Sequence, residues 1–329
     1  MVIPTYNRRE SLMVTLGGLS RQTFPRERFE VVVVSDGCSD GTHEALAEFV
    51  KQSPFTIRWF CQQNAGPAAA RNRGIREAAH EVIVFLDDDM EPVPEFLARH
   101  AGHHEDDLKV AVLGPMSPDP KRRAVEPVWI AWEHEKLQEI YRMLSPGGEY
   151  HGQAWSHHFY SGNASVRKEW LLAVGGFDES YKRQEDVQLA ERMERELGVH
   201  FVFDPTTDGL HRPLRSFSSW LHVPASYGEW DAERIRTGLL TWETVQDLAS
   251  RRNRGTRLLT AAALAFPPTI TLAALALRAG AVCLNRLGAR GPALSALSAL
   301  YNATYMCAIT RARRSPGANR PAREVKQTP

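Results

Sequence analysis

The chain has 329 residues, of which 43% are hydrophobic and 24% charged, and its formal net charge is +1. This composition is ordinary for a globular protein, and the length suffices for one large core with an appendage or for two domains. No CxxC pair is present, which argues against a cysteine-based zinc or redox motif and favours free thiols in a reducing compartment for Cys38, Cys61, Cys283 and Cys307. We therefore expect a cytoplasmic protein, and we expect no nucleic-acid partner.

Charge is distributed unevenly along the chain. Residues 1–215 hold 25 Lys and Arg against 33 Asp and Glu, a net charge of −8, whereas residues 216–329 hold 15 against 6, a net charge of +9. No acidic residue occurs between Asp247 and Glu324. Because a solvated helical surface normally mixes both signs, we expect this C-terminal region to face something anionic.

The chain opens on "MVIPTYN", in which residues 2–4 look like the second half of a β-strand. We therefore expect that the N-terminus is trimmed or misassigned, and that no signal peptide is present. A helical pattern formed by Leu12, Leu16 and Leu19 follows this strand.

Strand-like and helix-like patterns then alternate as far as about residue 215. Further strands are predicted at 30–35, 57–61, 82–86, 109–114 and 200–204, and further helices at about 42–50, 66–79, 124–144, 168–177 and 184–197. This alternation predicts an α/β fold with a doubly wound, mostly parallel sheet flanked by helices. The Pro-, Gly-, His- and Trp-rich region 115–165 suits a substrate-facing insertion. A C-terminal extension, helical for most of its length, occupies 216–329, with an end that we expect to be disordered.

The stretch "VIVFLDDDM" (82–90) combines a continuous apolar run with three consecutive aspartates. The apolar run is typical of a strand that is covered on both faces. Asp87, Asp88 and Asp89 then emerge at the carboxyl edge of the sheet, where open α/β sheets bind ligands. Because clustered carboxylates repel one another, we expect a divalent metal ion, an arginine or both beside them.

Two stretches earlier in the chain allow a structural and a functional interpretation. Asp36 in "VVVVSDG" is either a turn aspartate followed by glycine or a carboxylate that accepts a hydrogen bond from a nucleobase. "NAGPAAARNRG" (64–74) is either a tightly packed helix start or a phosphate site formed by Gly66, Arg71 and Arg73.

Two later positions also allow both a structural and a functional interpretation. Glu185 and Asp186 in "QEDVQL" could simply complement the dipole at the start of a helix. His211 stands shortly after the strand "HFVFD" (200–204), and a lone histidine of this kind is more often structural than functional.

Taken in order, six stretches resemble the inverting nucleotide-sugar transferases of glycosyltransferase family 2, which have the GT-A fold. They cover residues 1 to about 215 and read "VIPTYNR", "VVVVSDG", "NAGPAAARNRG", "FLDDDM", "SGNASVRKEWLLAVGGFDES" and "QEDVQLAERM". The resemblance implies a GT-A domain over 1–215 and a nucleotide-sugar donor, usually a UDP-sugar.

The resemblance also implies a role for each matching residue. Residues expected to line the donor are Pro4, Thr5, Tyr6, Asn7, Asp36 (which reads the base), Arg71, Asp87 and Asp88. Asp89 would bind Mg²⁺ or Mn²⁺, with His211 as a further ligand of the ion. Asp186 matches the catalytic base, and the acceptor and sugar region would include Gly162, Asn163 and Glu185.

The chemistry of such a transfer calls for these residue types. A sugar diphosphate leaves with negative charge, which a hard divalent ion held by carboxylates can neutralise. The acceptor hydroxyl needs a base on the opposite face of the anomeric carbon, and Asp186 can take that proton. A single displacement inverts the anomeric centre, so no second carboxylate is needed as a nucleophile.

Other enzyme classes with aspartates or glycines near strand ends fit less well. A haloacid-dehalogenase-type phosphatase would carry its Asp-x-Asp run on the first strand, whereas the triplet here follows about the fourth. A Rossmann dehydrogenase would need GxGxxG after an early strand, and a nucleotidyltransferase a Gly-rich basic loop after the first. A non-catalytic sugar- or nucleotide-binding scaffold protein of the same fold remains the alternative.

The sequence says less about the acceptor. "YHGQAWSHHFYSGN" (150–163) offers aromatic faces for a sugar or lipid together with His151, His157 and His158, which could equally be loop-packing residues. We expect a carbohydrate, a lipid-linked molecule or a small molecule as acceptor.

The C-terminal region holds two uncharged stretches, residues 258–277 and 292–310. Their length approaches that of a membrane span, but Ala and Thr dominate, and Pro267 and Pro268 would kink the first. Spanning helices, interfacial helices, a shallow hairpin and a soluble appendage that packs on the catalytic domain or forms a homo-oligomer all stay open. The flanking arginines at 251–257 and 311–314 favour association with anionic lipid on the cytoplasmic side.

Overall fold

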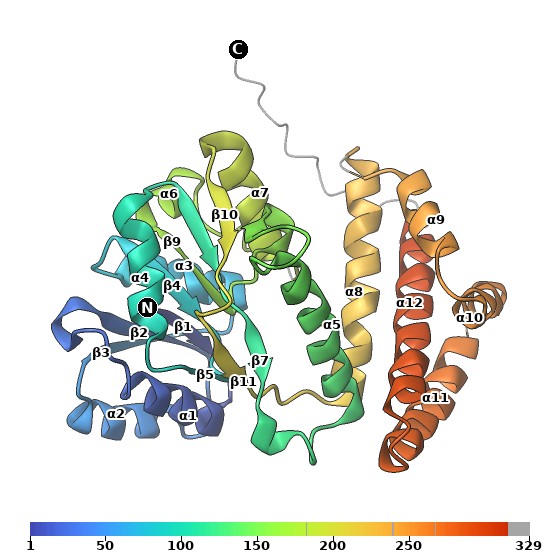
Figure 1. Cartoon of the computed structure of the whole chain (residues 1–329), viewed down its shortest axis with the longest axis horizontal. Coiled ribbons are helices and arrows are strands. Elements are labelled where there is room, and N and C mark those ends of the chain that lie inside the picture. The colour runs from blue at the N-terminus through green and yellow to red at the C-terminus, as the bar shows by residue number, and fades with distance from the viewer. Residues whose placement is uncertain (182, 239, 267, 315–329) are drawn as a thin grey trace. The chain divides into compact units, whose positions relative to one another are not determined.

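The computed structural model describes residues 1–181, 183–238, 240–266 and 268–314. By its internal contacts the chain divides into two compact units (Figure 1). Unit 1 contains Met1–Glu126 and Glu133–Leu214, and unit 2 contains Pro127–Trp132 and the chain from Arg215 onward. This division lies beside the expected boundary at residue 215, while the assignment of 1–215 and 216–329 as a catalytic domain and a helical extension stays a prediction. The C-terminal end that was expected to be disordered lies outside the described residues.

Unit 1 is built on an eight-stranded mixed sheet with the strand order β3-β2-β1-β4-β9-β6-β10-β8. Its strands are β1 (Val2–Thr5), β2 (Glu30–Asp36), β3 (Thr56–Gln62), β4 (Val82–Leu86), β6 (Val110–Leu113), β8 (Gln153–Ala154), β9 (Asn163–Arg167) and β10 (His200–Phe203). Strands β8 and β9 pair antiparallel with their neighbours, and the other pairs are parallel. The predicted α/β fold with a mostly parallel sheet is therefore confirmed.

Helices cover both faces of this sheet because its central strands are apolar on both sides. Along β2, Val31 and Val33 join one buried cluster, and Val32 and Val34 join the other. The first cluster lies under α1 (Arg9–Leu19), α2 (Thr42–Gln52) and α4 (Phe96–Asp106). The second lies under α3 (Pro67–Glu77), α6 (Lys168–Ala173), α7 (Glu185–Leu197) and the C-terminal half of α5 (Val128–Leu144). Short 3-10 turns are η1 (Arg26–Arg28), η2 (Pro120–Arg122) and η3 (Ser156–His158).

A second, three-stranded sheet places the end of unit 1 beside the acidic triplet. Its strands, in the order β5-β11-β7, are β5 (Met90–Pro92), β11 (Gly209–His211) and β7 (Met116–Pro118). Strand β5 begins directly after Asp89, and it pairs antiparallel with β11 so that His211 lies opposite Met90. A histidine more than a hundred residues away in sequence is thereby carried to the triplet.

Unit 2 is helical. It comprises α8 (Phe217–Arg236), α9 (Trp242–Ser250), α10 (Arg254–Ala265), α11 (Pro268–Arg286) and α12 (Arg290–Arg314). Helix α12 packs against α8, α10 and α11, and its approach to α8 is close because Gly228 has no side chain: a Cβ there would lie 2.5 Å from the carbonyl oxygen of Tyr305. The uncharged stretch 258–277 is divided between α10 and α11, so it does not form one continuous helix. Pro268 begins α11, where its missing N–H costs least.

The structure corrects two other predicted boundaries. The helix expected over 168–177 ends at Ala173, because Gly175 and Gly176 adopt positive φ angles of 80° and 74° in the turn that follows. The helix expected over 124–144 begins at Val128 instead, directly after Pro127.

Close packing between α3 and β1 generates a stability prediction. A Cβ at Gly74 would lie 2.3 Å from Cγ1 of Val2, in the buried cluster. Gly74→Ala should therefore lower the free energy of unfolding by about 1–3 kcal/mol, although alanine is the better helix former. Combining it with Val2→Ala should cost less than the sum of the two single changes, as measured by urea unfolding. A Gly74→Ala protein as stable as the wild type would contradict this packing.

Candidate active site

The three aspartates of the triplet emerge at the carboxyl edge of the main sheet, as predicted. Leu86, the last residue of β4, pairs with Asn163 at the start of β9. The backbone N–H of Asp87 continues this pairing by donating to the carbonyl oxygen of Gly162 at 3.1 Å. The antiparallel strand β9 thus brings the 160–163 segment alongside the acidic triplet.

Asp88 is buried and held from several sides. Its Oδ2 accepts a hydrogen bond from the Thr5 hydroxyl at 2.7 Å, and its Oδ1 accepts one from Arg8 Nη1 at 3.1 Å. Thr15 Oγ1 donates to its carbonyl oxygen at 3.0 Å. Burial raises the pKa of Asp88 to about 7, against the opposing effect of the Arg8 charge. Such a fixed and costly carboxylate is typical of functional sites.

Asp89 keeps one carboxylate oxygen available. Its Oδ2 accepts a hydrogen bond from Arg8 Nη1 at 2.9 Å, whereas its Oδ1 is buried and accepts no hydrogen bond from the described part of the chain. His211 Nε2 lies 3.6 Å from Oδ1, which is longer than a hydrogen bond. Since a buried carboxylate oxygen without a partner is costly, this oxygen is arranged for a cation.

The donor atoms here fit a shared ion better than an ion held by the protein alone. No group of three His, Cys, Asp or Glu side chains that could hold a metal ion occurs among residues 1–181, 183–238, 240–266 and 268–314. Asp89 Oδ1 and His211 Nε2 supply two donors of the kinds that Mg²⁺ and Mn²⁺ accept. An ion at this point would complete its coordination with water and with the oxygens of a bound ligand.

Arg71 of α3 links the triplet to the start of α7. It is 6% exposed, and its Nη2 donates to Asp87 Oδ1 at 2.8 Å while its Nη1 donates to Glu185 Oε1 at 3.3 Å. Burial disfavours the charged form, but the neighbouring carboxylates, Asp87 first, outweigh it and raise the pKa of Arg71. The predicted position of Arg71 at the acidic edge is therefore observed, and its contact with a donor stays a prediction.

Asp186 lies at the first turn of α7. Its Oδ2 accepts from the backbone N–H of Ser161 at 3.2 Å, and its Oδ1 accepts from the N–H of Val187 at 2.9 Å. Burial and the charge of Glu185 raise the pKa of Asp186, and Arg71 partly opposes the rise. A carboxylate in this environment binds a proton more readily than an ordinary aspartate does, which is useful in a base.

The residues expected to line a nucleotide lie at the ends of β1 and β2. Pro4 is half-buried within β1, whereas Tyr6 is 52% exposed. Asn7 has a left-handed backbone (φ 51°), and its Oδ1 accepts from the N–H of Ser39 at 2.7 Å, which ties the two strand ends together. Contacts of these residues with a nucleotide stay predictions.

Asp36 organises the loop that leads into α3. Its Oδ1 accepts from Gln62 Nε2 at 2.8 Å and from the N–H of Ala65 at 2.9 Å, and its Oδ2 accepts from the N–H of Gly66 at 2.8 Å. The carboxylate therefore shapes the loop whatever else it contacts, and base recognition by Asp36 stays a prediction.

The side chain of Asn163 makes its hydrogen bonds within unit 1. It is buried, its Nδ2 donates to the carbonyl oxygens of Pro115 and Thr207, both at 2.8 Å, and its Oδ1 contacts His100 Nε2 at 3.0 Å. It therefore fixes the chain behind the sheet edge, and a contact of Asn163 with an acceptor stays a prediction. Gly162 must stay small, because a Cβ there would lie 2.8 Å from Asp87 Oδ2.

Several residues of the site were missed from the sequence. Arg8 is the last residue of the "VIPTYNR" stretch, so an acidic triplet in need of a cation was the available signal for it. Ser161 contributes a backbone N–H, which no side-chain pattern reveals. His134, which contacts His211, and Glu126, which contacts His134, carry no recognisable motif.

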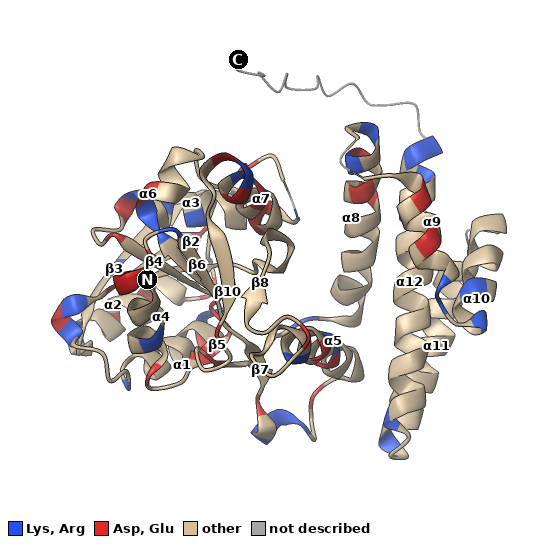
Figure 2. Ribbon diagram, turned by 45° about the horizontal axis from the view of Figure 1, so that its top comes forward, with Lys and Arg blue, Asp and Glu red and all other residues tan. Residues whose placement is uncertain are grey.

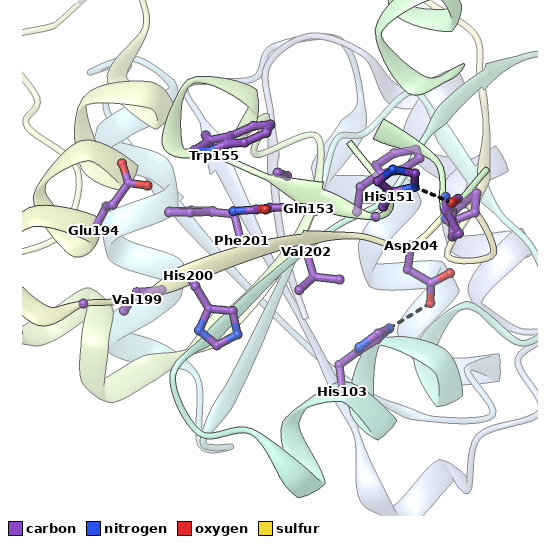
Figure 3. Close-up of a pocket in the computed structure, with 16 residues that line it drawn as sticks. His103, His151, Gln153, Trp155, Glu194, Val199, His200, Phe201, Val202 and Asp204 are labelled. Atoms are coloured by element: carbon purple, nitrogen blue, oxygen red, sulfur yellow. Dashed lines mark hydrogen bonds and ion pairs between the residues drawn. The ribbon is translucent and has the colours of Figure 1, made fainter. Parts of the chain in front are cut away.

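A cavity of about 860 Å³ lies elsewhere, at the C-terminal end of α7 and along β10. Figure 3 shows Trp155 on one side of β10 and His200 and Val202 on the other, with His103 and Asp204 paired at 2.9 Å. His151 also lines this cavity, but the residues of the charged site do not. The expected acceptor contacts of His151, and of His157 and His158 beside it, stay predictions.

The buried position of Arg71 leads to a prediction. Arg71→Met would leave Asp87 and Glu185 without their cation, so it should lower the free energy of unfolding by about 3–5 kcal/mol. Arg73→Met in the same helix is the matched control, because that guanidinium contacts no carboxylate among the described residues: it donates to the carbonyl oxygen of Cys61 in an exposed contact and lies 5.3 Å from the centre of the Phe60 ring. This change should cost less than about 1 kcal/mol. Equal losses in urea unfolding would contradict the assigned role of Arg71.

Comparison with known proteins agrees with this geometry. Residues 1–175 match the model of the family described as glycosyl transferase family 2. A validoxylamine A glucosyltransferase of Streptomyces hygroscopicus subsp. jinggangensis is 31% identical over 241 residues, which are 65% of this chain and 55% of that protein. The chain thus spans about half the length of this curated relative.

Two solved structures share the fold. A mannosyltransferase from Pyrobaculum calidifontis, in complex with GDP-Man and Mn²⁺, has a TM-score of 0.61 at 20% identity and covers 95% of this chain and 85% of its own. GalNAc-T7 with UDP, GalNAc and Mn²⁺ has a TM-score of 0.51 at 15% identity and covers 70% and 50%. With the family match over more than half of the chain, the α/β sheet and the acidic strand edge lead to one conclusion: the chain belongs to glycosyltransferase family 2, the nucleotide-sugar transferases with the GT-A fold.

Proposed function

We propose that the protein is an inverting glycosyltransferase that moves a sugar from a nucleoside diphosphate donor, a UDP-sugar, to an acceptor hydroxyl with the help of Mg²⁺ or Mn²⁺. The observation that carries the proposal is the buried Asp89 Oδ1, which accepts no hydrogen bond from the described residues and faces His211 at the edge of the sheet. Family membership supports the reaction class, and two proteins of the same fold were solved with Mn²⁺, one with GDP-Man and one with UDP and GalNAc.

Asp89 and His211 would hold the divalent ion. When bound, such an ion neutralises the negative charge that develops on the departing diphosphate. Arg8 already spans Asp88 and Asp89 with one Nη1, and its side chain is 37% exposed, so it is placed to turn toward a diphosphate oxygen without losing its position at the triplet.

Asp186 is the better base of the Glu-Asp pair. Glu185 is tied to the buried Arg71, whose Nη1 donates to its Oε1 at 3.3 Å. Asp186 accepts two backbone N–H groups, which orient the carboxylate, while burial and Glu185 raise its pKa. It would take the proton of the acceptor hydroxyl as this attacks the anomeric carbon, and one displacement inverts that centre.

The first test replaces the base. Asp186→Asn is nearly isosteric but cannot accept the proton, so kcat should fall by about 10²–10⁴-fold while donor affinity stays close to that of the wild type. Release of nucleoside diphosphate measures the rate, and NMR of the product gives the anomeric configuration. Near-normal kcat, or retention of configuration, would refute the proposed mechanism.

The pH dependence follows from the same environment. Because the pKa of Asp186 is raised, its deprotonated, active form is lost as the pH falls through that raised value. The acidic limb of kcat/KM should therefore lie above the range of an ordinary aspartate and should disappear in the residual activity of Asp186→Asn. An acidic limb that is identical in the two proteins would assign it to another group.

The second test addresses the ion. Asp89→Asn removes the charge of the proposed ligand, so it should lower turnover by orders of magnitude and abolish Mn²⁺-dependent binding of UDP, as should excess EDTA on the wild type. Asp107→Asn is the control, because this exposed aspartate pairs with His200 away from the site. Full activity of the wild type in excess EDTA would show that the reaction needs no divalent ion and would contradict this part of the proposal.

For the acceptor, we propose a molecule at an anionic cytoplasmic membrane surface that unit 2 contacts. Helix α11 is the one described helix that is long and apolar enough to cross a membrane, and only 11% of its apolar window is buried. It exposes Leu272 and Leu275 (65% and 64%), yet it buries Ala274 and Ala281 in the core of unit 2, which favours an interfacial position over spanning.

The charge of the same helices supports this location. Figure 2 shows basic residues at α10, and no acidic residue occurs along α10, α11 and α12. Leu258 on α10 and Phe266 after it are exposed as well. Apolar side chains rimmed by arginines suit anionic headgroups over acyl chains.

Flotation with vesicles tests the membrane proposal. The wild type should float with vesicles of phosphatidylglycerol and phosphatidylcholine and less with phosphatidylcholine alone. Leu272→Glu combined with Leu275→Glu should abolish flotation, whereas Leu108→Glu, at an exposed leucine of unit 1, should not. Wild-type protein that stays monodisperse at the bottom of the gradient would contradict membrane association, and a stable dimer would make the apolar surface a subunit interface.

A further inference from the structure

His211 is the outer end of a buried chain of ionisable side chains. Its Nδ1 lies 3.2 Å from Nε2 of His134, and the two rings meet edge to face at 75°. On the far side, His134 Nδ1 lies 3.0 Å from Glu126 Oε1. That last pair is at contact distance but outside the angle of a formed hydrogen bond. The order along the chain is therefore Glu126, His134, His211 and then Asp89.

Each member of this chain is held by a different element. His134 lies on α5 and is 2% exposed, His211 ends β11, and Glu126 precedes α5. Arg212, the residue after His211, ties the neighbouring backbone in place: its N–H donates to the carbonyl oxygen of Asp89 at 2.8 Å, and its Nε donates to Asp119 Oδ2 at 2.7 Å. The backbone at the end of β11 is therefore held in place beside Asp89.

The chemical nature of the neighbouring side chains determines which ring nitrogen of His134 and of His211 carries the proton. If His134 Nε2 carried the proton and donated to His211, a neutral His134 would present a lone pair from Nδ1 to the Glu126 carboxylate. Two acceptors would then face one another at 3.0 Å in a buried place, which is unfavourable. With the proton on His134 Nδ1, this nitrogen donates toward Glu126, and Nε2 accepts from His211 Nδ1–H. The contact between the two histidines then pairs a donor with an acceptor, and the protonated Nδ1 of His134, 3.0 Å from Glu126 Oε1, is attracted to the carboxylate although the angle is outside that of a formed hydrogen bond.

We infer that Glu126 and His134 are positioning residues that hold His211 in its Nδ1–H tautomer, so that the Nε2 lone pair is aimed at the cation beside Asp89. The inference rests on the proposed metal site and extends it by two residues. A neutral imidazole can bind a divalent ion only through the nitrogen that carries no proton, so the tautomer decides whether His211 is competent. Outer partners of this kind typically contribute 10–100-fold to metal affinity.

The first readout needs no metal. Long-range ¹⁵N–¹H NMR on the metal-free full-length protein at pH 8 should show His211 as the Nδ1–H tautomer, with its signals assigned by their loss in His211→Asn. In His134→Leu, which removes the acceptor, His211 should change to a mixture dominated by Nε2–H. In His134→Gln, whose amide oxygen can accept from Nδ1–H and whose NH₂ can donate to Glu126, the Nδ1–H tautomer should persist.

The second readout is the affinity for Mn²⁺ in the presence of UDP, measured by electron paramagnetic resonance. We expect a 10–100-fold loss in His134→Leu and a loss of less than about threefold in His134→Gln. His104→Leu is the matched control, because His104 is also buried but contacts Ser165 on β9, away from His211. That variant should lose stability and keep both the His211 tautomer and the Mn²⁺ affinity.

The outcomes separate this inference from the proposed function. If wild-type His211 is the Nε2–H tautomer, or if His134→Leu binds Mn²⁺ as tightly as the wild type while Asp89→Asn does not, the positioning role is wrong and the metal site stands. If the wild type binds no Mn²⁺ with UDP, the metal site itself fails, and the NMR result still decides the tautomer. If His134→Leu does not fold, the His211 tautomer and the Mn²⁺ affinity are measured in Glu126→Leu instead.

Discussion

Repulsion between three carboxylates at the end of one strand is the constraint that organises unit 1. Asp87, Asp88 and Asp89 follow a buried strand, where water cannot screen their charges fully. Arg71 forms an ion pair with Asp87, and Arg8 forms ion pairs with Asp88 and Asp89. The compensation is incomplete, because Asp89 Oδ1 accepts no hydrogen bond within the described chain. A site whose negative charge is incompletely neutralised favours the binding of a cation, and of a ligand that is bound together with that cation.

The same constraint separates the two acidic residues at the start of α7. Arg71 reaches Glu185 as well as Asp87, and this shared guanidinium links the triplet to α7. Glu185 is thereby fixed as a structural partner, while Asp186 is oriented by backbone N–H groups and has a raised pKa. One buried arginine thus gives two adjacent carboxylates different surroundings, and the proposed base is the one that Arg71 does not bind. The three-stranded sheet completes the site by carrying His211 to Asp89.

The central strands and the acidic edge were predictable from local patterns. Four uninterrupted valines in β2 and the apolar run before Asp87 identify strands that are covered on both faces, and the triplet marks where they end. Helix α7 was predictable from its amphipathic spacing, with Asp186 in its first turn. These features depend on neighbouring residues only.

Features that depend on tertiary contacts were not predictable. Strand β9 is short, and its pairing with β4 and β6 decides that the Asn163 side chain points inward to His100. Likewise, β5 and β11 are three residues each, and only their pairing joins His211 to the triplet. The residues His134 and Glu126 are recognised only once α5 and the preceding loop are placed beside β11.

The central claim is that Asp89 and His211 hold a divalent ion on which the donor diphosphate is bound. Its most direct test is anomalous scattering at the manganese edge from a crystal of the full chain grown with UDP and Mn²⁺. The account predicts one strong peak within bonding distance of Asp89 Oδ1 and His211 Nε2, in contact with the diphosphate. Bound UDP with no peak at these two atoms, and with Arg8 still bridging Asp88 and Asp89, would contradict it.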